Sequence, residues 1–212
     1  MKVLMLNGSC NPNGSTRVGL DVMAKVFAEE NVETEIVTLG PKAVVDCIGC
    51  GKCAELKRCV FANDEVNNFV AQAAQADGFV FGTPVYYAHP SGRVQSFLDR
   101  VFFSSRCADG YASFRHKPCS AIAVARRSGV TASLDVLTKY FGLSQMIAVG
   151  STYWNSFHAL TAADVPQDLE GLQTLRNLAR NMTYVMNCIK AGRDAGIAPP
   201  VAEEDVFTNF IR

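Results

Sequence analysis

Short apolar runs alternate along the chain with longer stretches in which apolar residues recur every three or four positions. The short runs predict buried strands, and the periodic stretches predict amphipathic helices that bury one face. The expected strands span residues 3–6, 35–39, 78–81, 121–125 and 146–149. Strict alternation of strands and helices is typical of an α/β fold with helices on both faces of a parallel sheet. It fits the five-stranded doubly wound order 2-1-3-4-5 better than the six-stranded dinucleotide fold.

Each expected helix carries one apolar face. The residues that mark these faces are Val18, Val22 and Val26; Val66, Phe69, Val70 and Ala73; Val94, Phe97, Leu98 and Val101; Leu134, Leu137 and Phe141; and a long series from Leu172 to Ile189. Asp64 precedes the second helix as its expected N-cap. The last helix is expected to end before Gly192, since glycine is common just past a helix end.

The domain organisation follows from these elements. We expect one domain over residues 1–192, interrupted by a cysteine-rich insertion at 46–60, and a C-terminal arm over 193–212. Two prolines, at 199 and 200, separate the arm from the last helix. The arm carries apolar side chains that are unfavourable in water, namely Val206, Phe207, Phe210 and Ile211. They predict that the arm docks on another surface, such as a partner subunit.

Composition narrows the classes of function. The chain has 212 residues, 49% of them hydrophobic, so it can bury one large core. Twenty basic and twenty acidic residues give a formal net charge of 0, which leaves no excess of positive charge for a nucleic acid or an anionic membrane. The chain turns polar at Asn7, too early for a signal peptide, and no apolar stretch approaches the roughly 18 residues of a membrane span. We expect a cytoplasmic protein.

The turn after the first strand, residues 7–16, consists of small, hydroxyl and amide side chains. A helix N-terminus offers unpaired N–H groups and the positive end of a dipole, and the hydroxyls of Ser9, Ser15 and Thr16 add donors. The Walker lysine and the Gly-x-Gly-x-x-Gly spacing are absent, so a phosphate monoester fits better than a triphosphate or a pyrophosphate. The alternative is an ordinary capping loop.

The end of the third strand, residues 82–92, brings two tyrosines to the carboxyl edge of the predicted sheet. Doubly wound folds bind ligands at this edge, and a flat heterocycle would fit against Tyr86 and Tyr87. In the alternative interpretation the tyrosines cover a helix, and Pro84 only ends the strand.

Four cysteines crowd into one short segment: Cys47, Cys50, Cys53 and Cys59. Their spacing is close to the bacterial ferredoxin pattern for an iron-sulfur cluster. Gly49 and Gly51 lie between them, where a chain must wrap closely round a metal centre, and nearby basic residues would offset thiolate charge. Three alternatives stay open: structural zinc, a redox-active Cys-x-x-Cys, and a loop that binds nothing. The remaining cysteines, Cys10, Cys107, Cys119 and Cys188, are expected to be buried or idle thiols.

Taken together, these motifs resemble the flavodoxin-like NAD(P)H-dependent FMN reductases, and within them the iron-sulfur flavoproteins. The resemblance runs from residue 2 to about 189 and rests on Gly8-Ser9 with Gly14-Ser15-Thr16, on Thr83-Pro84-Val85-Tyr86, and on the cysteine segment. It implies a flavodoxin-like fold, FMN as cofactor, and a 4Fe-4S centre near the flavin. It also implies a homodimer or homotetramer with flavin near the subunit interface.

The resemblance also implies which residues contact FMN. The phosphate would be held by Ser9, Asn11, Asn13, Gly14, Ser15 and Thr16, the ring by Thr83, Pro84, Val85, Tyr86 and Tyr87, and a third contact would come from Arg126, Arg127, Ser128 and Gly129. At this third loop the sequence departs from relatives that are richer in glycine. A cation there stabilises the anionic reduced flavin, although neighbours in an extended segment point opposite ways, so one arginine is expected to be solvated.

The function that follows is an FMN-dependent oxidoreductase without a catalytic side chain, because the flavin does the chemistry. Electrons would pass from NAD(P)H or a reduced carrier through FMN to a quinone, a flavin or an electron-transfer protein. The open face of the flavin would be lined by Tyr86, Tyr87, His89 and Trp154. A second hypothesis is an electron carrier that exchanges electrons with a ferredoxin-like donor and has no nicotinamide site. A phosphoacceptor receiver lacks its acidic pair here, and a serine hydrolase lacks Gly-x-Ser-x-Gly.

Overall fold

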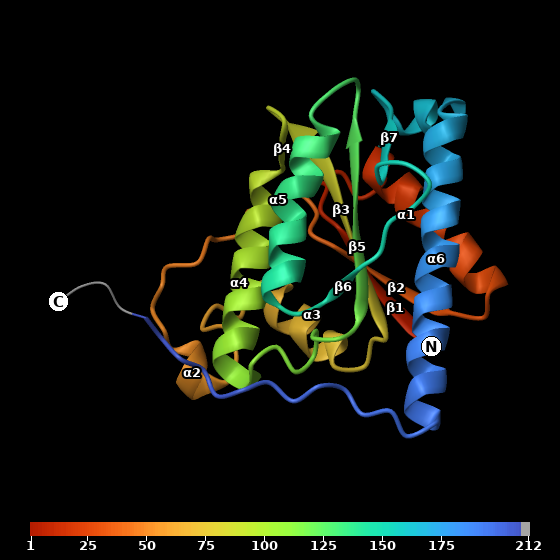
Figure 1. Cartoon of the computed structure of the whole chain (residues 1–212). Coiled ribbons are helices and arrows are strands. Elements are labelled where there is room, and N and C mark those ends of the chain that lie inside the picture. The colour runs from red at the N-terminus through yellow and green to blue at the C-terminus, as the bar shows by residue number, and fades with distance from the viewer. Residues whose placement is uncertain (209–212) are drawn as a thin grey trace.

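The computed structural model describes residues 1–208 and has a twisted parallel sheet at its centre (Figure 1). The strands along the main path are β1 (Lys2–Asn7), β2 (Glu33–Thr38), β3 (Gly78–Tyr86), β5 (Pro118–Ala125) and β6 (Ile147–Ala148). They follow the order β2-β1-β3-β5-β6, and all neighbours on this path are parallel. The predicted flavodoxin-like, doubly wound sheet with order 2-1-3-4-5 is confirmed, with β5 and β6 as its fourth and fifth strands.

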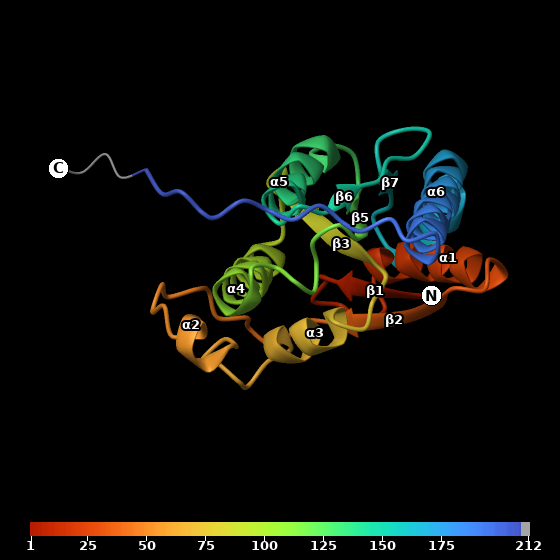
Figure 2. The same cartoon turned by 60° about the horizontal axis from the view of Figure 1, so that its bottom comes forward.

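Helices cover both faces of the sheet (Figure 2). One face carries α1 (Ser15–Glu29) and α6 (Leu169–Asp194), and the other carries α3 (Val66–Ala73), α4 (Gly92–Asp109) and α5 (Val130–Leu143). Side chains alternate along β1, so Leu4 and Leu6 join the core under α3, α4 and α5, whereas Val3 and Met5 join the core under α1 and α6. Asp64, the predicted N-cap of α3, lies one residue before the observed N-cap Glu65, and it accepts a hydrogen bond from Val66 N at 3.2 Å.

The third strand is longer than predicted. It continues through Pro84, which pairs with Val124 of β5, and ends at Tyr86, where the short antiparallel β4 (His89–Pro90) turns back on it. The alternative in which Pro84 ends the strand is therefore wrong. On the other side of β3, the neighbouring strand β1 ends at Asn7, opposite Gly82. Pro84 lies beyond this point, so the N–H that proline lacks is not needed for a hydrogen bond to β1.

The fifth strand position is divided between two short strands. Only Ile147 and Ala148 of the predicted strand 146–149 pair with β5, and β7 (Ser156–His158) pairs with the opposite end of β5. In the intervening loop, Ser151 Oγ donates to Thr174 O of α6 at 2.6 Å. This bond holds the loop toward α6, so part of the β5 edge is left without a strand.

The last helix was predicted to end before Gly192. In the structure it continues to Asp194. The chain turns instead at Gly196, whose φ of +83° lies in the left-handed region that glycine favours. Ile197 N donates to Gly192 O at 2.9 Å and closes this turn. Within the arm, Val206 and Phe207 are exposed, and Phe210 and Ile211 lie outside the described residues. Among the helices of residues 1–208, none is long and apolar enough to cross a membrane.

Candidate functional site

The first strand-to-helix turn, residues 8–14, is ordered by its own side chains. Asn7 Oδ1 accepts a hydrogen bond from Ser9 N at 3.2 Å, and Ser9 Oγ accepts one from Asn11 N at 3.1 Å. Asn11 Oδ1 accepts one from Asn13 N at 3.0 Å. Gly14 is the N-cap of α1, and no described side chain caps this helix end. The N–H groups of the first turn are therefore available to an anion.

A cavity of about 440 Å³ opens beside this turn, at the carboxyl ends of β1, β3 and β5. Its lining comes from four segments: Ser9, Cys10, Asn11, Gly14, Ser15 and Thr16; Pro84, Val85 and Tyr86; Val124, Ala125 and Arg126; and Ala159, Leu160, Thr161 and Ala162. Doubly wound sheets bind their ligands at this edge. We refer to this space as the edge cavity.

The structure brings most of the predicted FMN contacts together and separates others from them. The predicted residues that line the edge cavity are Ser9, Asn11, Gly14, Ser15, Thr16, Pro84, Val85, Tyr86 and Arg126. Those outside its lining are Asn13, Thr83, Tyr87, Arg127, Ser128 and Gly129. Of the described residues that line the edge cavity, Arg126 alone carries a charged side chain. Arg127 lies outside this lining, and both arginines are exposed in a bend after β5 rather than in the extended segment that was expected.

Two residues outside the lining hold the loops that form it. Thr83 Oγ1 accepts from Ser91 N at 3.1 Å and donates to Pro84 O at 2.8 Å, which ties the end of β3 to the start of α4. Gly129 has φ +92°, and a Cβ there would lie 2.6 Å from Ala88 Cα. Gly129 is therefore needed for a close approach of two loops.

The fourth wall of the edge cavity, residues 159–162, was missed by the sequence analysis. It follows β7 and leads into the short 3-10 helix η1 (Ala162–Gln167). Asp164 Oδ2 accepts from both Thr161 N at 2.8 Å and Thr161 Oγ1 at 2.9 Å, so the segment is fixed by a capping box. The spacing Thr161-x-x-Asp164 is the one local signal that could have indicated a helix start here.

Of the four residues predicted to line the open face of the flavin, Tyr86 is the one that lines the edge cavity. Its side chain is 52% exposed, and its Oη lies 4.0 Å from Cys10 Sγ. Burial raises the pKa of Tyr86, and the neighbouring Cys10 raises it further. Tyr87 and His89, predicted to line the same face, are exposed and do not line the edge cavity.

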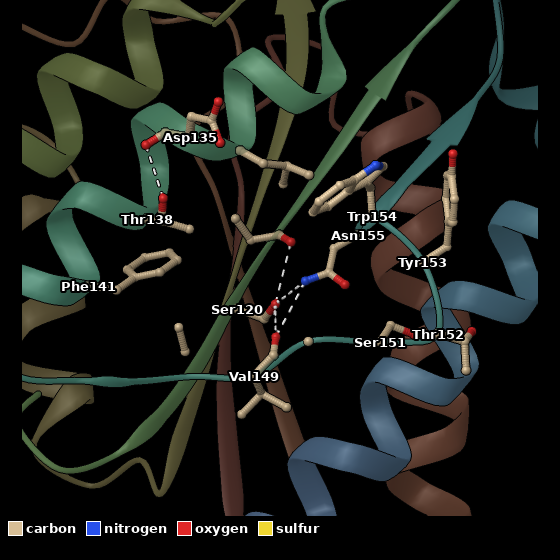
Figure 3. Close-up of a pocket in the computed structure, with 14 residues that line it drawn as sticks. Ser120, Asp135, Thr138, Phe141, Val149, Ser151, Thr152, Tyr153, Trp154 and Asn155 are labelled. Atoms are coloured by element: carbon tan, nitrogen blue, oxygen red, sulfur yellow. Dashed lines mark hydrogen bonds between the residues drawn. The ribbon is translucent and has the colours of Figure 1, made fainter.

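Trp154 lines a different cavity, of about 510 Å³, between α5 and the loop that joins β6 to β7 (Figure 3). Asn155 Nδ2 donates to Ser120 Oγ at 2.8 Å, and Ser120 Oγ donates to Val149 O at 3.0 Å. This cavity exists because β6 and β7 leave the middle of β5 uncovered. The structure therefore does not place Trp154 against the edge cavity.

The four clustered cysteines all line one small cavity, of about 20 Å³, between their loop and α4. The loop contains the four-residue helix α2 (Cys53–Leu56). Gly49 and Gly51 have φ of +63° and +67°, so the backbone between the cysteines uses the conformation that glycine allows. Over residues 1–208, no three His, Cys, Asp or Glu side chains converge closely enough to hold a metal ion. The thiols thus share a cavity without enclosing a single-ion site.

Helix α4 contributes the other wall of the cysteine cavity. Arg100 is 1% exposed and donates from Nε to Cys59 Sγ at 3.3 Å. Further along α4, Cys107 adjoins Cys53. Burial raises the pKa of the Cys53 thiol to about 11, and a hydrogen bond with Cys107 adds to the effect. Neither Arg100 nor Cys107 was assigned to this site by the sequence analysis, because both lie on a helix far from the cysteine loop in sequence.

A family model described as NADPH-dependent FMN reductase matches residues 1–160. This chain belongs to that family. The iron-sulfur flavoprotein MJ1083 of Methanocaldococcus jannaschii is 31% identical over 197 residues, which cover 90% of this chain and 100% of that relative. The iron-sulfur flavoprotein of Methanosarcina thermophila is 24% identical over 92% of this chain and 100% of its own length. The predicted iron-sulfur flavoprotein branch of the FMN reductase family is thus confirmed.

Solved structures show the same fold as this FMN reductase family member. RosB with a bound 8-demethyl-8-formylriboflavin-5'-phosphate intermediate has a TM-score of 0.68 at 15% identity, covering 100% of this chain and 94% of its own. An archaeal flavodoxin has a TM-score of 0.58 at 11% identity, covering 88% of this chain and 99% of its own. At these identities the likeness concerns the fold alone. A flavin oxidoreductase or electron carrier is the class of function that the family supports.

Gly8 makes a close backbone contact at the end of β1, directly before the turn that lines the edge cavity. Its N–H donates to Gly82 O at 2.9 Å, which joins the ends of β1 and β3. A Cβ at Gly8 would lie 2.0 Å from Val94 Cγ2 and 2.7 Å from Gly82 O. Because the carbonyl belongs to the backbone, it cannot rotate away as a side chain can.

Gly8→Ala is therefore expected to lower the free energy of unfolding by about 1–3 kcal/mol, the usual cost of overpacking. Gly92→Ala is the matched control, since a Cβ at Gly92 meets nothing within 4 Å and its φ is not in the left-handed region. Urea unfolding followed by circular dichroism compares the two variants. Equal stability of Gly8→Ala and Gly92→Ala would contradict the close approach at Gly8.

Proposed function

We propose that this chain is an FMN-dependent oxidoreductase that binds FMN in the edge cavity. The observation that carries the proposal is the uncapped N-terminus of α1, which opens onto a cavity of about 440 Å³ at the carboxyl ends of the strands. The N–H groups of the first helical turn and the hydroxyls of Ser15 and Thr16 suit a phosphate monoester. The family supports FMN as the molecule that carries it.

The remaining walls suit the rest of FMN. Val85 and Tyr86 offer apolar and aromatic surface for a flat ring, and the capping box at Thr161 fixes the wall formed by residues 159–162. Arg126 would place positive charge beside the cofactor, where it favours the anionic reduced flavin. When bound, FMN supplies the redox chemistry. The residues of this chain bind it, orient it and set the charge around it.

A second cofactor is part of the same proposal. Cys47, Cys50, Cys53 and Cys59 would hold a 4Fe-4S cluster, which supplies one-electron transfer when bound. The donor set fits, since all four cysteines line one cavity and each can supply a thiolate ligand. The relatives named iron-sulfur flavoproteins support this assignment over structural zinc or a thiol pair.

The electron donor separates two versions of this function. In the first, NAD(P)H reduces the flavin, and electrons pass to a quinone, a flavin or an electron-transfer protein. In the second, the chain is an electron carrier without a nicotinamide site, and a ferredoxin-like donor reduces the cluster. The cysteine cavity favours the second version, because a cluster held there would add a one-electron centre that hydride transfer from NAD(P)H to a flavin does not require.

Anaerobic purification followed by flavin, iron and sulfide analysis tests the proposal. We expect one FMN and four irons per chain. A reduced ferredoxin should bleach the flavin absorbance. Over the same time, NADH or NADPH should leave the flavin spectrum unchanged. Rapid bleaching by NAD(P)H would favour the first version. A protein that takes up no FMN at micromolar concentration would contradict both versions.

Assembly into a homodimer or homotetramer belongs to this proposal as well. Within the described part of the arm, Val201, Val206 and Phe207 are 95%, 91% and 75% exposed. Apolar side chains this exposed are unfavourable in water, and a neighbouring subunit would cover them.

A further inference from the structure

Arg100 is a fully buried cation that contacts the cysteine loop at several points. Its side chain is 1% exposed, and its Nε donates to Cys59 Sγ at 3.3 Å. Nη1 donates to Val45 O at 3.1 Å, and Nη2 donates to Phe61 O at 3.4 Å. Asp64 pairs with both ends of the guanidinium, with Nη2–Oδ1 at 3.1 Å and a second bond from Nη1 to Oδ2. All three guanidinium nitrogens therefore have partners.

The orientation of this guanidinium goes beyond what ion pairing requires. A buried charge costs several kcal/mol unless it is paired, and Asp64 supplies the pairing through the two terminal nitrogens. The third nitrogen, Nε, faces a cysteine sulfur rather than an oxygen. Sulfur is a weak acceptor as a neutral thiol and a much better one as a thiolate, so this contact gains most when Cys59 carries negative charge.

We propose that Arg100 is a positioning residue for the iron-sulfur cluster, which orients the Cys59 ligand through Nε and raises the reduction potential of the cluster. The inference rests on the proposed function, because it requires the four cysteines to hold a cluster. Hydrogen bonds to ligand sulfurs and net charge near the ligands are among the factors that set cluster potentials.

The direction of the effect follows from the charge that reduction adds. An electron accepted by a thiolate-bound cluster increases the negative charge on its sulfurs. A donor held 3.3 Å from one ligand sulfur therefore stabilises the reduced form more than the oxidised form. Arginine stays protonated in proteins, so it supplies this charge in both redox states.

Asp64 has the opposite effect, since its carboxylate offsets the guanidinium charge. Asp64→Asn keeps the shape of the side chain and an oxygen acceptor for Arg100, and asparagine is as good as aspartate where Val66 N is capped. Without the negative charge of Asp64, the positive charge of Arg100 is less offset and acts more strongly on the Cys59 sulfur. The potential is therefore expected to rise in Asp64→Asn and to fall in Arg100→Gln.

Opposite shifts distinguish this role from a purely structural one. If Arg100 only fastened the loop to α4 (Figure 2), both variants would loosen the same contacts and would change iron content or stability in the same direction. Arg58→Gln is the matched control. Arg58 neighbours Cys59 in sequence but is exposed, so water and salt screen its charge.

The test uses the full chain, reconstituted anaerobically with iron and sulfide, and a reductive titration with dithionite followed by electron paramagnetic resonance. One dithionite is oxidised to two sulfites and supplies two electrons, one to each of two clusters. At a fixed potential, Arg100→Gln should change the oxidised-to-reduced ratio at least tenfold toward oxidised, about 59 mV for one electron. Asp64→Asn should change it toward reduced, and Arg58→Gln should change it less than either.

Each outcome decides the inference. Unchanged potentials in iron-loaded Arg100→Gln and Asp64→Asn, or shifts of both in one direction, would overturn it while leaving the proposed function intact. If Arg100→Gln holds no iron, the reduction potential of Asp64→Asn alone decides: a rise supports the inference, and no change or a fall overturns it. If the unaltered chain assembles no cluster, the cluster part of the proposed function fails and the inference fails with it, whereas FMN binding is scored separately.

Discussion

Ser15→Asp is expected to abolish retention of FMN, with a loss of affinity of at least about a hundredfold, or about 3 kcal/mol. Ser15 is the first residue of α1 and lines the edge cavity. The substitution removes a hydroxyl donor and places a carboxylate where the dianionic phosphate is proposed to bind. An acidic residue in the first turn of a helix favours the helix itself by about 0.3–1 kcal/mol, so the fold should not be weakened. Equilibrium dialysis against FMN and urea unfolding separate binding from stability.

Asn13→Asp is the matched control for this substitution. Asn13 belongs to the same turn but is exposed and lies outside the lining of the edge cavity. It introduces the same charge two residues away and should weaken FMN binding far less. Similar losses in both variants would indicate a general electrostatic effect, and undiminished FMN binding by Ser15→Asp would contradict the placement of the phosphate at α1.

Phe81→Ala is expected to lower the free energy of unfolding by about 3–5 kcal/mol, as large-to-small substitutions of buried aromatics do. Phe81 is fully buried at the centre of the core under α3, α4 and α5. Its ring lies 5.2 Å from that of Phe141, 6.0 Å from Phe69 and 6.1 Å from Phe102, measured between centroids. Removing it leaves a void that these three helices cannot fill without moving.

Leu169→Ala serves as the control, since Leu169 is 73% exposed at the start of α6 and its truncation should change stability little. Thermal unfolding provides the comparison, at about 2–4 °C in Tm per kcal/mol for a chain of this size. A Phe81→Ala protein as stable as Leu169→Ala would contradict the packing described around β3.

The main strands were predictable because buried strands appear in the sequence as continuous apolar runs. The central strands β1, β3 and β5 are buried on both faces, so each appears as an apolar run bounded by turn residues. The divided fifth strand was not predictable in the same way. The apolar run over residues 146–149 predicted the strand that contains β6, but β7 holds only three residues and leaves no run or period that identifies it.

The candidate site was predictable only where it is local. The turn over residues 8–14 directly follows a strand and directly precedes a helix, so its placement at the sheet edge follows from sequence order. The wall at residues 159–162 reaches the same cavity only because β7 pairs with the end of β5. Arg100 lies between Leu98 and Val101, at a position where the helical period predicts an exposed polar residue. It is buried because the cysteine loop folds over it.

The shortness of β6 has a consequence for how copies of this chain can meet. A free strand edge exposes unpaired N–H and C=O groups, and a long one invites pairing with another molecule. Here one border of the sheet is divided between β6, of two residues, and β7, of three, and the opposite border, β2, carries Glu33 and Glu35. Neither border suits extension into a continuous intermolecular sheet. Association between copies is therefore directed to contacts made by helices, loops and the arm, and the molecule is protected from edge-to-edge aggregation.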